Sequence, residues 1–144
     1  MEFRTIPLSL QQLSLSAVLR CGQSFRWHAL VIEPPSPKSE RESLHAEPPT
    51  HEYRFALRDR IVCLRQTRDA LLYRALYSQR VEPSHQATLD LETESWIRDY
   101  FQLDVDLVDL YRQWSCNDAN FTGLKDRFEG IRMLRQDPWE NLIS

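Results

Sequence analysis

The sequence lacks the features of membrane and secreted proteins. No apolar run approaches the roughly 18 residues that a membrane-spanning helix needs. The first eight residues carry Glu2 and Arg4 in place of the apolar stretch of a secretory signal. We therefore expect no membrane partner and a chain that begins inside the cell. Its 144 residues, 42% hydrophobic and 27% charged, exclude collagen-like, low-complexity and wholly disordered proteins and predict about one domain.

Cysteine is too scarce for a disulfide framework. Cys21, Cys63 and Cys116 are far apart and odd in number, and they form no Cys-x-x-Cys spacing. The four histidines likewise form no ligand spacing. We expect reduced thiols, no metal site and no cofactor.

Charge is unevenly distributed along the chain. The net charge of −3 offers nucleic acid no overall attraction. Locally, residues 51–80 hold seven arginines against three acids, whereas residues 82–110 hold eight acids and one base, Arg98. We interpret these segments as solvated strand faces followed by an acidic helix surface.

The hydrophobic pattern predicts strands first and helices afterwards. Strands are expected at residues 3–8, 23–28, 53–57, 61–66 and 71–77. A helical turn is expected over 14–20, and Gly22 is expected to interrupt the regular structure after it. In the second strand, Phe25 and Trp27 lie two residues apart and are expected in the core, with Arg26 on the opposite face as a solvated side chain or a phosphate contact. Residues 33–52 contain five of the eight prolines and are predicted to form a solvated, flexible insertion.

Helical spacing begins at Glu92. Trp96 with Tyr100, and Ile97 with Phe101, are four residues apart. A second helix is expected over residues 107–114. A third is expected after the capping residues Asn117 and Asp118 and until Gly130, with Phe121, Leu124 and Phe128 facing inward. This order predicts an α+β domain in which helices pack on one face of an antiparallel β-sheet.

The end of the sequence carries the signals of another helix. Asp137, Pro138 and Glu140 stand at the positions of a cap, a first helical residue and the glutamate of a capping box. The few residues that follow are too short for an isolated helix, and Trp139 would have few partners. We therefore expect an N-terminal domain over residues 1–136, followed by 137–144 as the first turns of a truncated helical domain of a longer protein.

Three separated motifs carry a family resemblance. They are Gly-Gln-Ser-Phe-Arg-Trp at 22–27, Phe-Gln-Leu-Asp at 101–104 and Gly-Ile-Arg-Met-Leu-Arg-Gln-Asp-Pro at 130–138, with the segment 111–114 also in place. In this order they resemble the N-terminal domain of eukaryotic 8-oxoguanine DNA glycosylase over nearly the whole chain. The proline-rich stretch departs from the family as a longer surface insertion. The resemblance implies a TATA-binding-protein-like α+β fold.

The resemblance also implies base-excision repair. Such an enzyme, a DNA glycosylase and AP lyase, flips oxidised guanine out of damaged double-stranded DNA and breaks its glycosidic bond. Gly22 matches the family's glycine whose backbone carbonyl accepts the hydrogen on N7 of the damaged base, and it is the one substrate-binding residue carried over. A turn glycine is the simpler reading of Gly22. A monomer in the nucleus is expected, with mitochondria left open as a second location.

No catalytic residue is expected within these 144 residues. The family's nucleophilic lysine and catalytic aspartate lie beyond the part that matches Ser144, and neither Lys38, in the proline-rich segment, nor Lys125 has the setting of a pocket residue. Arg132 and Arg135 are equally compatible with a buried ion pair and with a DNA contact. The alternative function is a non-catalytic α+β module that binds protein or nucleic acid. A small hydrolase is disfavoured because no spaced acid and base pair is present.

Overall fold

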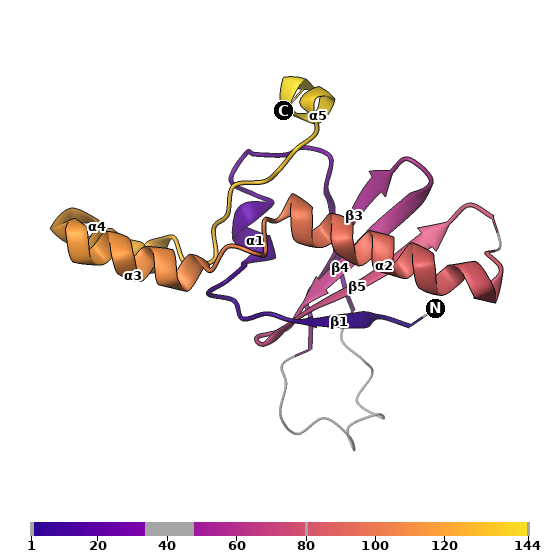
Figure 1. Cartoon of the computed structure of the whole chain (residues 1–144), viewed down its shortest axis with the longest axis horizontal. Helices are drawn as coiled ribbons and strands as arrows, with labels where there is room; N and C mark the ends of the chain where they lie inside the picture. The colour runs from indigo at the N-terminus through magenta and orange to yellow at the C-terminus, as the bar shows by residue number, and fades with distance from the viewer. Residues whose placement is uncertain (1, 34–47, 80, 144) are drawn as a thin grey trace, which may run out of the picture. The chain divides into compact units, whose positions relative to one another are not determined.

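The computed structural model describes residues 2–33, 48–79 and 81–143 (Figure 1). The elements are β1 (Arg4–Pro7), α1 (Leu15–Val18), β2 (His28–Val31), β3 (His51–Leu57), β4 (Arg60–Gln66), β5 (Ala70–Tyr77), α2 (Pro83–Tyr100), α3 (Leu107–Asn117), α4 (Ala119–Leu124), the 3-10 helix η2 (Lys125–Arg127) and α5 (Pro138–Ile143). The strands form one antiparallel sheet, so the predicted α+β class is confirmed.

The chain divides into two compact units. The sheet unit comprises residues 1–7 and 26–93, and the helical unit comprises residues 8–25 and 94–144. Helix α2 begins in the first unit and ends in the second. The expected boundary after residue 136 stays a prediction.

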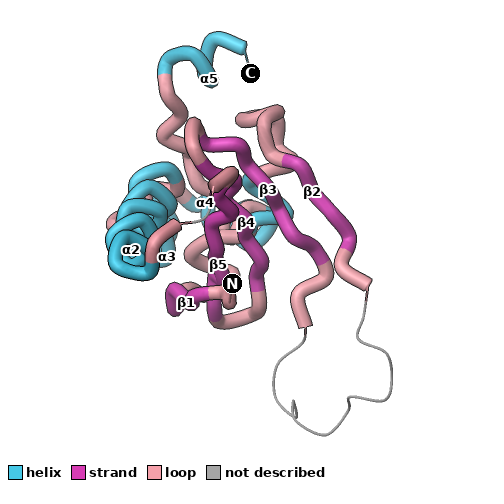
Figure 2. Tube along the Cα trace, turned by 90° about the vertical axis from the view of Figure 1, so that its right-hand side faces the viewer, coloured by secondary structure: helices cyan, strands magenta, loops and turns pink. Residues whose placement is uncertain are grey.

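The sheet runs in the order β1-β5-β4-β3-β2, with β4 in the middle (Figure 2). Alternate residues point to opposite faces. Because Tyr53, Leu64 and Tyr73 stand opposite one another in the ladder, they share one face, and all three are buried. Ile6, Phe55, Val62, Leu71 and Ala75 belong to the same buried face. The alternation of side chains along each strand therefore accounts for this buried face.

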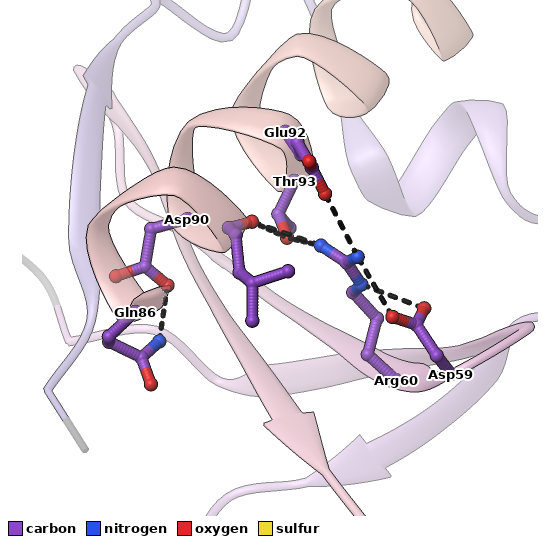
Figure 3. A network of polar contacts seen from close by, with 7 residues as sticks. Asp59, Arg60, Gln86, Asp90, Glu92 and Thr93 are labelled. Carbon is purple, nitrogen blue, oxygen red and sulfur yellow. Dashed lines mark hydrogen bonds and ion pairs between the residues drawn. The ribbon is translucent and has the colours of Figure 1, made fainter. Parts of the chain in front are cut away.

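The first half of α2 is tied to the sheet by polar contacts. Arg60, at the start of β4, donates from Nη1 to the carbonyl of Leu89 at 3.0 Å and to the hydroxyl of Thr93 at 2.9 Å (Figure 3). A second tie joins Arg4 of β1 to Asp90 at 2.7 Å. Hydrogen bonding to Asp59 raises the pKa of Arg60.

The opposite face of the sheet carries an ion cluster. Glu52 is buried and accepts from Arg54 at 2.7 Å, Arg65 at 2.8 Å and Arg74 at 3.3 Å. The guanidinium groups of Arg65 and Arg74 also lie over the ring of Phe3. Part of the positive charge counted in residues 51–80 is therefore neutralised within the sheet.

The strand predicted at residues 23–28 is wrong. Strand β2 begins at His28, and Phe25 is 71% exposed. Trp27 does pack on Phe55, with ring centroids 5.0 Å apart. The two-residue spacing of these aromatic side chains predicted a strand. In the structure, this segment is instead a loop that precedes β2. The predicted core role is thus right in part for Trp27 and wrong for Phe25.

Other boundaries also differ from the sequence prediction. Helix α2 begins at Pro83, well before Glu92, and β3 begins at His51 inside the segment predicted as an insertion. Residues 34–47 of that insertion lie outside the described residues. The predicted helix to Gly130 ends at Leu124 and continues as η2, and Leu124 and Phe128 are close to half exposed instead of facing inward. The ring of Phe121 does pack on α3, with its centroid 5.3 Å from that of Tyr111 and 5.5 Å from that of Trp114, so the predicted inward position is right for this residue.

The first helical pattern is confirmed. Ile97 and Phe101 are fully buried in the helical unit, and the ring of Tyr100 stacks on Trp96 with centroids 4.8 Å apart. Leu13, Leu15, Val18, Leu107 and Leu134 complete this core. Asp106 caps the N-terminus of α3, and its carboxylate accepts from the backbone N–H of Asp109.

Candidate functional site

The candidate site is built on the turn at Gly22, in the helical unit. Gly22 follows α1 and has a φ of 84°, in the left-handed region that glycine adopts without a Cβ penalty. A Cβ added at this residue would have no described heavy atom within 4 Å, apart from its chain neighbours. The backbone conformation requires glycine here, and the space beside the residue is open.

The next residue, Gln23, joins this turn to the segment that follows Gly130. Its side-chain Nε2 donates to the carbonyl of Arg132 at 2.8 Å, and its Oε1 accepts from the backbone N–H of Leu134 at 3.0 Å. The backbone carbonyl of Gln23 accepts from the side chain of Gln136. Two motifs separated by more than a hundred residues are therefore held side by side.

These segments line a pocket of about 610 Å³. Its lining residues are Gly22, Gln23, Gln102, Met133, Leu134, Arg135, Gln136 and Asn141. Gln102 has a φ of 50° and donates from Nε2 to the carbonyl of Met133 at 2.8 Å. All three motifs of the family resemblance thus contribute to one pocket, whose lining is suited to hydrogen bonding through amides and backbone groups.

Arg132 is buried in the helical unit and bonds to Gln102, one of the residues that line this pocket. It is 5% exposed and donates to the carbonyl of Gln102 at 2.7 Å, to the side-chain oxygen of Gln12 at 2.6 Å and to the carbonyl of Gln12. Burial lowers the pKa of Arg132. These three acceptors are neutral oxygens, so the bonds give Arg132 a structural role.

The other arginines singled out in the sequence lie elsewhere. Arg135 is exposed and forms an ion pair with Asp99. Arg26, in the sheet unit, donates to the carbonyl of Ala56 at 3.0 Å and lies over the ring of Phe55 at 4.4 Å. Arg26 is therefore neither freely solvated nor placed in the Gly22 pocket.

Of the two lysines, Lys125 is not among the described residues that line the Gly22 pocket. Lys125 lies in η2 and lines a different pocket of about 420 Å³ together with Tyr111 and Cys116. Lys38 lies outside the described residues. Within the described part of the chain, no three His, Cys, Asp or Glu side chains gather as ligands for a metal ion. None of the described helices is long and apolar enough to cross a membrane.

Several residues of the site were not singled out from the sequence. Gln23 and Gln102 stand inside the motifs, but their side-chain bonds to distant backbone groups have no local signal. Asn141 reaches the pocket because α5 begins at Pro138. The bonds of Gln23 and Gln102 to residues 132–134 bring these segments together.

Comparison with known proteins identifies a family whose match covers all three motifs. The model of the family "8-oxoguanine DNA glycosylase, N-terminal domain" matches residues 5–142. The chain is 29% identical to the N-glycosylase/DNA lyase of Saccharomyces cerevisiae over 99% of its own length. It spans about a third, 33%, of the length of that relative. The chain therefore belongs to the 8-oxoguanine DNA glycosylase N-terminal domain family.

Proposed function

We propose that this chain is the N-terminal part of a base-excision-repair DNA glycosylase and AP lyase that removes 8-oxoguanine from duplex DNA. In this proposal it supplies one wall of the pocket that receives the flipped base. The observation that carries the proposal is the pocket itself, in which Gly22, Gln102 and Gln136 come from three motifs of the family. The yeast relative is named as an N-glycosylase/DNA lyase.

The chemistry of Gly22 suits discrimination between oxidised and normal guanine. Oxidised guanine carries a hydrogen on N7, where normal guanine has a bare acceptor. A backbone carbonyl at Gly22 would accept that hydrogen, whereas it would face another acceptor in normal guanine. An unsatisfied buried acceptor costs about 1 to 3 kcal/mol, which corresponds to about 5- to 150-fold in affinity. The open space beside Gly22 leaves room for a base edge to approach.

The catalytic groups are proposed to come from outside these 144 residues. A Schiff-base nucleophile requires a lysine of lowered pKa in a closed pocket, and Lys125 lies on η2 away from the residues that line the Gly22 pocket. DNA affinity is also assigned mainly to other parts of the protein, because the net charge here is −3. We further propose that the protein is a monomer that acts in the nucleus, with mitochondria as a second location.

The isolated chain provides the first test. Purified residues 1–144 should neither excise oxidised guanine from a duplex nor form a borohydride-trapped adduct with it. Trapping that disappears in a Lys38→Ala/Lys125→Ala double variant would show that the chain holds its own nucleophile. The assignment of the chemistry to other parts of the protein would then be wrong.

The second test places Gly22 in a complete enzyme. Residues 1–144 replace the matching third of the yeast relative, and excision of oxidised guanine is compared for the parent chimera and Gly22→Ala. The variant should lose on the order of tenfold in kcat/KM, because the new Cβ occupies the approach to the base. Affinity for undamaged duplex should hardly change, since phosphate contacts dominate it.

A matched control separates this effect from backbone strain. Gly123, in α4, also has no described atom within 4 Å of an added Cβ, but its φ is ordinary for a helix. Gly123→Ala should leave excision unchanged. The φ of Gly22 predicts a loss of about 1 kcal/mol in stability for Gly22→Ala, so melting is measured before the kinetics. A folded Gly22→Ala chimera that still discriminates oxidised from normal guanine would reduce Gly22 to a turn residue.

A further inference from the structure

Helix α5 buries a single acidic side chain. Trp139, Leu142 and Ile143 are 67%, 74% and 53% exposed, whereas Glu140 is 1% exposed. In so short a helix, the usual arrangement would bury the apolar side chains and leave the carboxylate in water. The inward position of Glu140 therefore requires hydrogen-bond donors that stabilise it.

Those donors come from two distant segments of the helical unit. The Glu140 Oε1 atom accepts from the hydroxyl of Ser24 at 2.6 Å and from the hydroxyl of Tyr100 at 2.7 Å. The amide of Gln136 approaches the same oxygen at 3.3 Å. Ser24 and Tyr100 are themselves buried, at 4% and 3% exposed. One carboxylate oxygen thus joins the end of α2, the first motif and α5.

Ser24 lies two residues after Gly22, which makes this contact relevant to the pocket. Gly22 is exposed and has open space where a side chain would stand. As a glycine, it has no side chain whose packing could fix the position of its carbonyl. The turn is instead held from its C-terminal side, by Gln23 through the backbone of residues 132 and 134 and by Ser24 through Glu140. A shift of Ser24 would be transmitted directly to Gly22.

We infer that Glu140 is a positioning residue of the Gly22 pocket, acting through the Ser24 hydroxyl to hold the Gly22 carbonyl where an oxidised base would meet it. The inference rests on the proposed function. It assigns to Glu140 a role in recognition and none in bond breaking. Misplacement of a binding group by about 1 Å can cost on the order of a hundredfold in rate, so a contact two residues away is sufficient to matter.

The chemistry of the contact predicts which substitutions are tolerated. Glutamine keeps a side-chain oxygen that can accept from both hydroxyls. Leucine fills a similar volume but offers no acceptor, so the buried hydroxyls of Ser24 and Tyr100 lose this partner. Glu140→Gln is therefore the conservative variant and Glu140→Leu the disruptive one.

The test uses the same chimera with the yeast relative. The readouts are kcat/KM for excision of oxidised guanine and the ratio of affinities for duplexes that contain oxidised and normal guanine. Glu140→Leu should lose on the order of tenfold in both readouts, and Glu140→Gln should restore values close to the parent. Ser24→Ala should behave like Glu140→Leu, because it breaks the same link from the other side.

Two controls distinguish positioning from a general loss of stability. Leu142→Ala changes an exposed side chain of the same helix and should alter neither readout. Arg60→Met removes buried hydrogen bonds in the sheet unit and should lower the melting temperature without changing discrimination. If Glu140→Leu lowers stability as Arg60→Met does and leaves discrimination intact, Glu140 is structural only and the inference is wrong.

The result with Gly22→Ala separates this inference from the proposed function. If Gly22→Ala reduces discrimination and folded Glu140→Leu does not, the pocket assignment stands and the positioning role fails. If neither variant reduces discrimination, both fail. Should Glu140→Leu not fold, Ser24→Ala decides alone, because it keeps the Tyr100 contact to Glu140; parental discrimination in Ser24→Ala would then overturn the inference.

Discussion

The two units of this chain are stabilised in different ways. In the sheet unit, the ladders that join β3, β4 and β5 consist of backbone hydrogen bonds, and side chains add a core on one face. In the helical unit, long polar side chains bond to distant backbone groups. Gln23 bonds to residues 132 and 134, and Gln12 accepts from the backbone N–H of Leu107 at 2.9 Å.

This difference teaches where single substitutions should matter most. A ladder survives the change of one side chain, because its bonds belong to the backbone. A connection that a single glutamine, arginine or glutamate side chain makes to a distant segment is lost when that side chain is removed. The candidate pocket belongs to the second kind of structure, so its shape should depend on individual residues.

The largest expected effect is Gly130→Ala in the helical unit. Gly130 has a φ of 71°, and an added Cβ would collide with the carbonyl of Leu10 and lie 2.6 Å from the backbone N of Ser14. Backbone atoms on both sides leave little room for relaxation. We expect a loss of about 3 kcal/mol or more, measured by urea unfolding. Gly123→Ala is the control, and a loss in Gly130→Ala as small as in that variant would contradict the close approach.

A smaller effect is expected for Glu52→Gln in the sheet unit. The substitution leaves Arg54, Arg65 and Arg74 facing one another without the central negative charge. We expect a loss of about 2 kcal/mol, reduced by the partial exposure of the arginines and by the intact ladder. Amide exchange in β4 measures it. If Glu52→Gln destabilises the chain more than Gly130→Ala does, the comparison between the units is wrong.

Acid should weaken the sheet unit through the same cluster. Burial disfavours the Glu52 carboxylate, but the hydrogen bonds from Arg54 and Arg65 and the charge of Arg74 outweigh it and hold the pKa below its ordinary value of 4.5. The unfolded chain therefore binds this proton more readily than the folded one. The contribution is complete above about pH 4.5 and is lost as the pH falls through the lower pKa of the folded state. Glu52→Gln should flatten this part of the pH profile of β4 exchange, and an unchanged profile would exclude Glu52 as its source.

The smallest effect is expected within α5. Trp139 is 67% exposed, in line with the expectation that it has few partners, whereas Glu140 is buried. The backbone N–H groups of Glu140 and Asn141 bond to Asp137 at 2.8 and 2.9 Å. We expect their amide exchange to be slower than the random-coil rate and faster than that of residues 61–66. Random-coil exchange at Asn141 would contradict these bonds and show that α5 is frayed.

Prediction from the sequence succeeded where the pattern was local. Alternation at residues 53–57, 61–66 and 71–77 matches β3, β4 and β5, and the spacing of Ile97 with Phe101 matches a buried helix face. The cap at Asp137 is also confirmed by its bond to the N–H of Glu140. Each of these signals depends on neighbours within a few residues.

The same local logic failed at Phe25 and did not contain the long-range contacts of Glu140. Phe25 has the spacing of a strand residue but is exposed. Glu140 has the position of a capping-box residue, and its carboxylate accepts from Ser24 and Tyr100. In both cases the outcome depends on residues far away in the sequence, which a local pattern does not contain.

The sequence by itself determined the class of the fold, the sheet core and the family, because periodicity and motif order are written along the chain. The tertiary structure decided the site. Gly22, Gln102 and Gln136 form one pocket because Gln23, Arg132 and Glu140 satisfy their hydrogen bonds across long sequence separations. Burial of a polar group is favourable when a partner is in place, and the partner's position is set by the folded chain.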